Sequence, residues 1–409
     1  MNQAVPVLPS EDTVALAGLV RVCEPPSAAL ARFVDKVGAV AAWHGVLARR
    51  APQAVLAATA ARTDNLTREA LARRAEGDLV TAAAAGARLI GRQDPGWPGD
   101  AVASFQGALA RGVRGAAPPV ALYVRGRPLF GLPGRGVTIV GSRASSAYGQ
   151  RVAGEMSHEL ACRGITVISG AAFGIDTAAH RGALHAGRSG AAGGTPPTTV
   201  AVLACGIDRA YPEANRTLLD AIAQSGAVVS EYPPGTTPAR HRFLVRNRLI
   251  AAFGAATVVV EAGRRSGTLS TAAAAEQLGR LVMAVPGPVT SAMSVGCHLL
   301  LSDRFAQLVT GAEDVLAALG RLPPENRNDQ REEPTPGQDP LHPTDGLDEV
   351  GVLVYDALPT RASCSIDDLV VESGLSSTQV MGALAVLHLH GLAGKEGAHW
   401  RRLTPADHR

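Results

Sequence analysis

The sequence lacks any apolar stretch long enough to cross a bilayer. The best run, residues 249–260, is 12 residues long and ends at Glu261, whereas a membrane-spanning helix needs about 20 apolar residues. The first residues show no basic segment followed by an apolar run, so we expect no secretory signal. These absences predict a cytoplasmic protein without membrane contact.

Cysteine is scarce as well. The five cysteines are odd in number and lie far apart, and none belongs to a CxxC pair. This pattern excludes a disulfide framework and a CxxC zinc site, and it fits a reducing compartment. The pair His388 and His390 is more typical of a surface than of a metal site. We therefore expect no bound metal.

Lysine is almost absent. Thirty-nine residues are lysine or arginine, and only Lys36 and Lys395 are lysine. The single Gly-Lys pair, at 394–395, is followed by Glu396, so no Walker A loop is present, and no GxGxxG follows a predicted strand. The sequence therefore lacks the motifs of P-loop nucleotide hydrolysis and of ordinary dinucleotide binding, and we predict no cofactor.

Positive charge is concentrated in one region. Residues 232–302 contain seven arginines but only two acids, Glu261 and Glu276. Within this region, residues 240–248 place four arginines around Phe243. Guanidinium groups suit phosphate oxygens, and an aromatic ring offers bases a stacking surface. The alternative is a solvated helix face whose arginine stems cover apolar surface.

Four segments differ in composition. Residues 1–115 show helical periodicity and end in a connector, 116–321 alternate apolar runs with helices, 322–345 contain six prolines, and 346–409 form a compact module. The apolar runs of the second segment are residues 137–140, 165–169, 199–204, 227–230, 256–260 and 281–285. Such runs predict an α/β fold with a Rossmann-like, doubly wound, mostly parallel sheet. In the last segment, three predicted helices followed by a hairpin are typical of a winged helix.

Glycine-rich turns follow three of the predicted strands, at 141–143, 170–176 and 205–208. Strand ends of a parallel sheet share one edge, where helix N-termini favour phosphate groups. Ser142, Arg143 and Gly170 are the candidate residues of the first two turns, and Ser266-Gly267-Thr268 forms another hydroxyl-bearing turn after 256–260. We predict that Asp176 and Asp208 cap helices.

Several long motifs occur together in one order. They are VTIVGSR (137–143), GAAFGIDTAAHRGAL (170–184), CGIDRAYPEANRTL (205–218), RFLVRNRLIA (242–251) and EAGRRSGTLSTAAAAEQLGR (261–280). Over residues 88–318 the chain resembles the DNA-processing protein A (DprA/Smf) family. The resemblance implies an extended Rossmann domain, a SAM-like or helix-hairpin-helix-like N-terminal domain and a winged-helix appendage. It also implies a homodimer that binds single-stranded DNA, loads the RecA recombinase in natural transformation, and has no enzymatic turnover.

The resemblance also assigns DNA-binding residues. Arg143 matches a phosphate-contacting arginine, Phe243 matches an aromatic that contacts a base, and Arg240 stands where many members have lysine. The remaining matches are the RNR signature, Arg246, Asn247 and Arg248, and the turn Ser266, Gly267 and Thr268.

Two features depart from the family pattern. Gly296-Cys297-His298 replaces Gly-Cys-Asn, and Asp303-Arg304-Phe305 replaces a Gly-Ala segment. The predicted helix 377–390 has no lysine or arginine, so we expect the C-terminal module to contact protein, with only a minor DNA role for Lys395, Arg401 and Arg402. The alternative function is a nucleotide sensor or a phosphoribohydrolase-like enzyme, although Thr271 stands where that enzyme's glutamate belongs.

Overall fold

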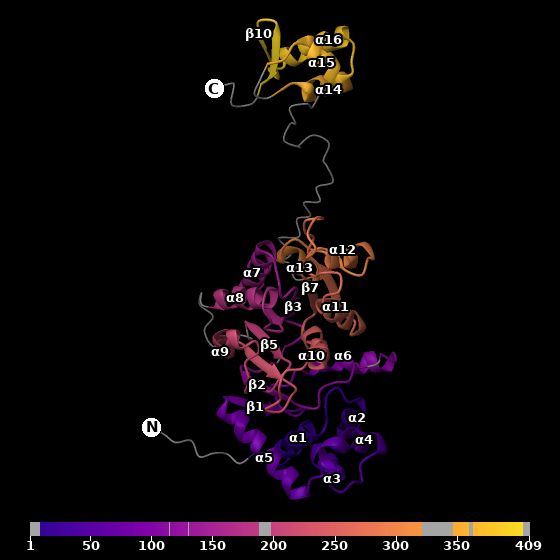
Figure 1. Cartoon of the computed structure of the whole chain (residues 1–409), viewed down its shortest axis with the longest axis vertical. Helices are drawn as coiled ribbons and strands as arrows, with labels where there is room; N and C mark the ends of the chain where they lie inside the picture. The colour runs from indigo at the N-terminus through magenta and orange to yellow at the C-terminus, as the bar shows by residue number, and fades with distance from the viewer. Residues whose placement is uncertain are drawn as a thin grey trace, which may run out of the picture. The chain divides into compact units, whose positions relative to one another are not determined.

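The computed structural model describes residues 9–113, 115–129, 131–187, 198–320, 347–359 and 363–403. The chain divides into two compact units, residues 1–322 and 323–409 (Figure 1). The expected proline-rich linker, 322–345, lies outside the described residues. All five cysteines are free.

The first unit begins with five helices, as the periodicity predicts. They are α1 (Glu11–Val22), α2 (Ala28–Val37), α3 (Ala39–Leu47), α4 (Gln53–Thr63) and α5 (Arg68–Ala84). Ser10, Ser27 and Thr67 cap α1, α2 and α5 by accepting a backbone N–H of the first turn. Trp43 packs against α1, where a Cβ at Gly18 would lie 2.6 Å from the indole. These helices gather at one end of the sheet, beside β1 and β2 (Figure 1).

A nine-stranded sheet forms the centre of the first unit, in the order β1-β2-β6-β5-β4-β3-β7-β8-β9. Pairing is parallel from β6 through to β9, while β2 is antiparallel to both β6 and β1. The strands are β1 (Ala87–Ile90), β2 (Leu122–Gly126), β3 (Gly136–Val140), β4 (Thr166–Ser169), β5 (Thr199–Leu203), β6 (Ala227–Ser230), β7 (Ala256–Val259), β8 (Leu281–Ala284) and β9 (Gln307–Leu308). The mostly parallel, Rossmann-like sheet is therefore confirmed.

Helices cover both faces of this sheet. They are α6 (Gly99–Ala110), α7 (Ala147–Cys162), α8 (Ile175–Gly187), the 3-10 helix η1 (Glu213–Asn215), α9 (Arg216–Ser225), α10 (Arg240–Phe253), α11 (Thr268–Gln277), α12 (Val295–Ser302) and α13 (Ala312–Ala318). One core joins α6, α10 and α11 to the sheet, and another joins α7, α8 and α13 to it. α7 and α8 pack so closely that a Cβ at Gly182 would lie 2.1 Å from the Gly154 carbonyl oxygen.

The sheet includes residues that lie before the expected domain boundary at residue 115. Residues 87–90, expected to be part of a connector, form the edge strand β1. Ile90, Trp97 and Phe105 then join the hydrophobic core of the sheet. Ala87 and Leu89 of the same strand pack in a second core with the N-terminal helices, so β1 connects the helices to the sheet within one compact unit.

The second unit contains three helices and a hairpin. These are α14 (Glu349–Ala357), α15 (Ile366–Ser373), α16 (Ser377–Leu389), β10 (Ala393–Glu396) and β11 (His399–Arg402). Capping boxes begin α15 and α16, at Ser365 and Ser376. Within the described ranges no single helix is long and apolar enough to cross a membrane; α15 and α16 meet the length and composition criterion only as a bent pair, with 106° between them.

Candidate nucleic-acid interface

A groove opens at the carboxyl edge of the sheet, where the strand order reverses around β3. Open parallel sheets bind ligands at such a point, because the connections leave neighbouring strands toward opposite faces. The groove holds about 950 Å³, and its walls are the loops after β3 and β7 and one side of α10. The predicted residues that line it are Ser142, Arg143, Arg240, Phe243, Arg246, Asn247, Ser266, Gly267 and Thr268.

Helix α10 forms the central wall of the groove, and its two halves differ in composition. Residues 249–253 are apolar and buried against the sheet, which anchors the helix. The first half carries the arginines, and Arg240, Phe243 and Asn247 recur at helical spacing on the groove side. The helix therefore holds cationic and aromatic side chains at the groove on a rigid support.

Phe243 is flanked by cations and by a second ring. The guanidinium carbon of Arg143 lies 4.9 Å from the centre of the Phe243 ring, and that of Arg246 lies 5.9 Å from it. The Tyr211 ring is tilted against Phe243, with 5.3 Å between ring centres. Arg143 and Tyr211 are exposed. The cluster offers a nucleobase an aromatic face beside a positive charge.

Arg246 lies beneath this cluster and organises the floor of the groove. Its side chain is buried and donates to the carbonyl oxygens of Gly170, at 2.8 Å, and Val202. A Cβ at Gly170 would lie 2.6 Å from Arg246 Nη1, so glycine makes room for the guanidinium. Burial lowers the pKa of Arg246 to about 10, while Asp176 raises it, so the side chain remains a cation at neutral pH. Gly170 thus acts through Arg246 and does not line the groove.

The turn before α11 forms the opposite wall. The Ser266 hydroxyl accepts the Thr268 N–H at 3.2 Å, which orders the turn. The Asn247 amide donates to Ser270 Oγ at 2.8 Å and so joins α10 to α11. Nothing lies within 4 Å of the position a Cβ would take at Gly267. The turn therefore borders the groove at a helix N-terminus and leaves room beside Gly267, an arrangement that suits phosphate oxygens.

Comparisons with known proteins identify this architecture. The sequence model of the family described as DNA recombination-mediator protein A matches residues 89–320. The chain belongs to this family. A putative DNA processing protein DprA of Mycobacterium tuberculosis is 45% identical over 390 residues, covering 95% of this chain and 94% of that protein. The DNA processing protein DprA of Streptococcus pneumoniae is 41% identical over 204 residues, covering 49% of this chain and 66% of that protein.

A solved structure also resembles the chain. The X-ray structure of DNA processing protein A from Streptococcus pneumoniae superposes with a TM-score of 0.57 at 28% sequence identity, covering 76% of this chain and 98% of that one. The family match begins at residue 89, inside β1. The matched residues therefore include nearly the whole sheet and the groove at its carboxyl edge.

Arg248 is placed differently from the expectation that it binds DNA. It lies five residues after Phe243, on the side of α10 that faces the core. Its Nη2 donates to both carboxylate oxygens of Glu231 at 2.6 Å, and both side chains are buried. Burial raises the pKa of Glu231 and the charge of Arg248 opposes that rise. In this family member, Arg248 has a carboxylate partner in place of the expected phosphate.

The aspartates also differ from expectation, because neither caps a helix. Asp176 lies in the first turn of α8 and accepts the Ala172 N–H at 3.3 Å. Asp208 Oδ1 accepts the Gly235 N–H at 2.9 Å. Asp176 is the only carboxylate among the described residues that line the groove. It is buried beside Arg246, so the exposed rim keeps its positive charge.

Some residues of the groove were not predicted from the sequence. Arg265 is exposed and lines the rim, and its place after β7 in an acid-poor stretch is a signal for it. Tyr211 carried no signal, because 32 positions separate it from Phe243 in the sequence. In the described part of the chain, no three His, Cys, Asp or Glu side chains come together as metal ligands.

Proposed function

We propose that the chain is a non-catalytic recombination mediator of the cytoplasm that binds single-stranded DNA with little sequence preference. It then loads the RecA recombinase onto incoming strands in natural transformation. The proposal is supported by the family to which the chain belongs. The observation that carries it is Phe243, whose ring centre lies 4.9 Å from the guanidinium carbon of Arg143 and 5.9 Å from that of Arg246 in the groove.

The groove favours a strand over a duplex for a physical reason. A base can stack on Phe243 only when it has left a base pair. Phosphates contact Arg143, Arg240 and the turn at 266–268 without reading sequence, and every base has a face that stacks. Binding at arginines releases counterions, so affinity falls as salt rises.

The C-terminal unit has a different part in this proposal. We propose that its three helices and hairpin are a winged-helix module that contacts protein. α16 has no lysine or arginine, and α15 and α16 expose large apolar side chains: Val371, Met381, Val386 and Leu389. Arg402 donates to backbone carbonyls of α14. With so few basic residues in this unit, we assign Lys395 and Arg401 at most a minor DNA role.

Homodimerisation completes the proposal, since two grooves on one strand raise avidity without new contacts.

The test is a salt titration of oligo(dT) and of a matched duplex by fluorescence anisotropy. Light scattering gives the oligomeric state, and RecA filament formation on strands coated with a single-strand-binding protein gives the mediator activity. We expect preference for the strand, a dimer, and faster filament formation. Equal affinity for strand and duplex, or filaments no faster than without the protein, would refute the function.

A further inference from the structure

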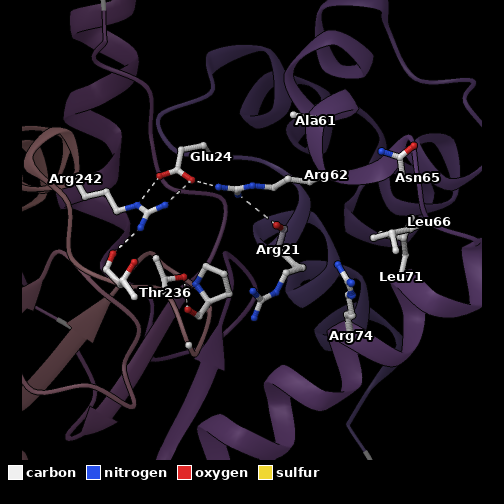
Figure 2. A pocket seen from close by; sticks show the side chains of 13 residues that line it. Arg21, Glu24, Ala61, Arg62, Asn65, Leu66, Leu71, Arg74, Thr236 and Arg242 are labelled. Carbon is white, nitrogen blue, oxygen red and sulfur yellow. Dashed lines mark hydrogen bonds and ion pairs between the residues drawn. The ribbon is translucent and has the colours of Figure 1, made fainter.

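A second cationic cleft lies between the N-terminal helices and the start of α10. It holds about 530 Å³ and is separate from the groove described above. Four arginines from four helices line it: Arg21 of α1, Arg62 of α4, Arg74 of α5 and Arg242 of α10. Figure 2 shows Arg62 and Arg242 approaching Glu24 from opposite sides.

The acids at this cleft do not balance its arginines. Glu24, the one carboxylate among the described lining residues, accepts from Arg62 and, at 2.8 Å, from Arg242 Nε. Arg21 is paired with Asp78, which lies behind the cleft wall. Arg74 is exposed, and its charge, like that of Arg21, counters the rise that burial causes in the pKa of Asp78. Counting Asp78, four arginines face two carboxylates.

The electrostatic environment of Arg62 shows the same excess. Burial lowers the pKa of Arg62, and the neighbouring charges of Arg242 and Arg21 lower it further. Cations that repel one another in a partly desolvated cleft are stabilised by an anion, and guanidinium forks match phosphate geometry. An anion in the cleft would therefore relieve the repulsion of Arg62 by Arg242 and Arg21.

The remaining walls suit the rest of a nucleotide. Leu66 and Leu71 form an apolar side, and the exposed Asn65 places an amide beside them. A pocket of this volume that combines apolar surface with a few convergent polar groups is typical of small-ligand sites. The cleft offers cations at one side and a surface for a base at the other.

The two sites are neighbours in the chain. Arg240 lines the main groove and Arg242 lines the cleft, and both belong to the first turn of α10. The preceding segment borders both sites as well, with Thr237 at the cleft and Pro238 at the groove. We propose that the cleft between the N-terminal helices and α10 is a second phosphate-binding site, which takes the phosphate of a nucleotide. The nucleotide is either free or part of the strand that leaves the main groove; the strand source rests on the proposed function and the free source does not.

The test compares Arg74→Ala with Arg73→Ala in the full chain. Arg73 is the preceding residue of α5, is exposed, and does not line the cleft, so both variants remove one surface charge from the same helix. The first probe is dTMP, followed by calorimetry and by methyl NMR of Leu66 and Leu71. Each titration is repeated with Phe243→Ala, which impairs the main groove and leaves the cleft intact.

The second probe is oligo(dT) of about 6 and about 20 nucleotides, lengths that bracket the span of a single binding domain. Weaker dTMP binding by at least about fivefold in Arg74→Ala, and by less than about twofold in Arg73→Ala, supports a free nucleotide. A loss of that size confined to the longer oligonucleotide supports the strand. The site is refuted if Arg74→Ala and Arg73→Ala behave alike with both probes. The dTMP titration tests the phosphate site in the cleft even if the protein binds no single-stranded DNA.

Discussion

The guanidinium carbon of Arg143 lies 4.9 Å from the centre of the Phe243 ring, although 100 positions separate the two residues in the sequence. Arg143 comes from the loop after β3, and Phe243 comes from α10. The fold brings these elements together at the edge where the strand order reverses. The pair thus places a phosphate contact and a stacking surface within the reach of one nucleotide.

Phe243→Ala removes the stacking surface and should weaken oligo(dT) binding by about 1–3 kcal/mol, roughly 5- to 150-fold. Phe243→Tyr keeps an aromatic ring and should bind within about twofold of the wild type. Fluorescence anisotropy measures both affinities, and thermal melting confirms that both variants fold. A folded Phe243→Ala protein with undiminished affinity would rule out stacking at this position.

Arg143→Ala removes an exposed phosphate contact and should change the salt dependence of binding. The slope of log affinity against log salt should become shallower by about 0.7, the value for one contact to a single strand. The matched control is Arg151→Ala, because Arg151 is an exposed arginine of α7 that does not line the groove. An identical slope for the two variants would show that Arg143 does not meet a phosphate.

The parallel strands β3 to β8 were predictable from the sequence because each is a short apolar run that the helices on both faces of the sheet bury. The parallel strand β9 was not predicted, because its two residues, Gln307 and Leu308, are exposed. β1 and β2 were not predicted for a different reason. Each is an antiparallel strand near the sheet edge, and Arg88 and Arg125 interrupt their apolar patterns. A strand of four residues that leaves one side chain exposed looks like a connector until its partner is known.

Most residues that line the groove were predictable from the sequence, but the contact that each one makes was not. The motifs place hydroxyls, glycines and arginines at strand ends, and the topology then brings them together. The carboxylates that neutralise two of the α10 arginines could not be predicted. Glu24 reaches Arg242 from the N-terminal helices, and Glu231 reaches Arg248 from the end of β6. Pairing across such distances in sequence follows from tertiary packing alone.

The buried pair of Arg248 and Glu231 predicts a stability effect in place of a DNA-binding effect. Arg248→Met leaves Glu231 buried without its cation and should destabilise the protein by about 3–5 kcal/mol. The double variant Arg248→Met with Glu231→Gln removes both charges and should recover a large part of this loss. Urea unfolding measures both changes. If Arg248→Met retained full stability and lost oligo(dT) affinity, Arg248 would be a phosphate contact and not a structural ion pair.

His180 predicts how stability depends on pH. The imidazole is fully buried in α8, and its Nδ1 lies 2.7 Å from Thr199 Oγ1. Because the Thr199 hydroxyl donates to the Val167 carbonyl oxygen, Nδ1 carries the proton and donates to Thr199. Nε2 has no hydrogen-bond partner among the described residues. Burial, aided by the nearby charge of Arg246, lowers the pKa of His180 to about 3.

Over the pH interval between its unfolded and folded pKa values, His180 is therefore protonated in the unfolded chain and neutral in the folded protein. Between the unfolded pKa of about 6.5 and the folded value of about 3, acidification favours the unfolded state, and the contribution of His180 to stability falls with pH. From about pH 7 to about pH 5 the wild type should lose ~2 kcal/mol relative to His180→Gln, which cannot titrate. Taking the difference between the two proteins cancels the opposing titration of Asp176, whose pKa burial raises. Urea unfolding at each pH measures that difference, and a constant difference across this range would mean that the folded protein accommodates a charged imidazole at this site.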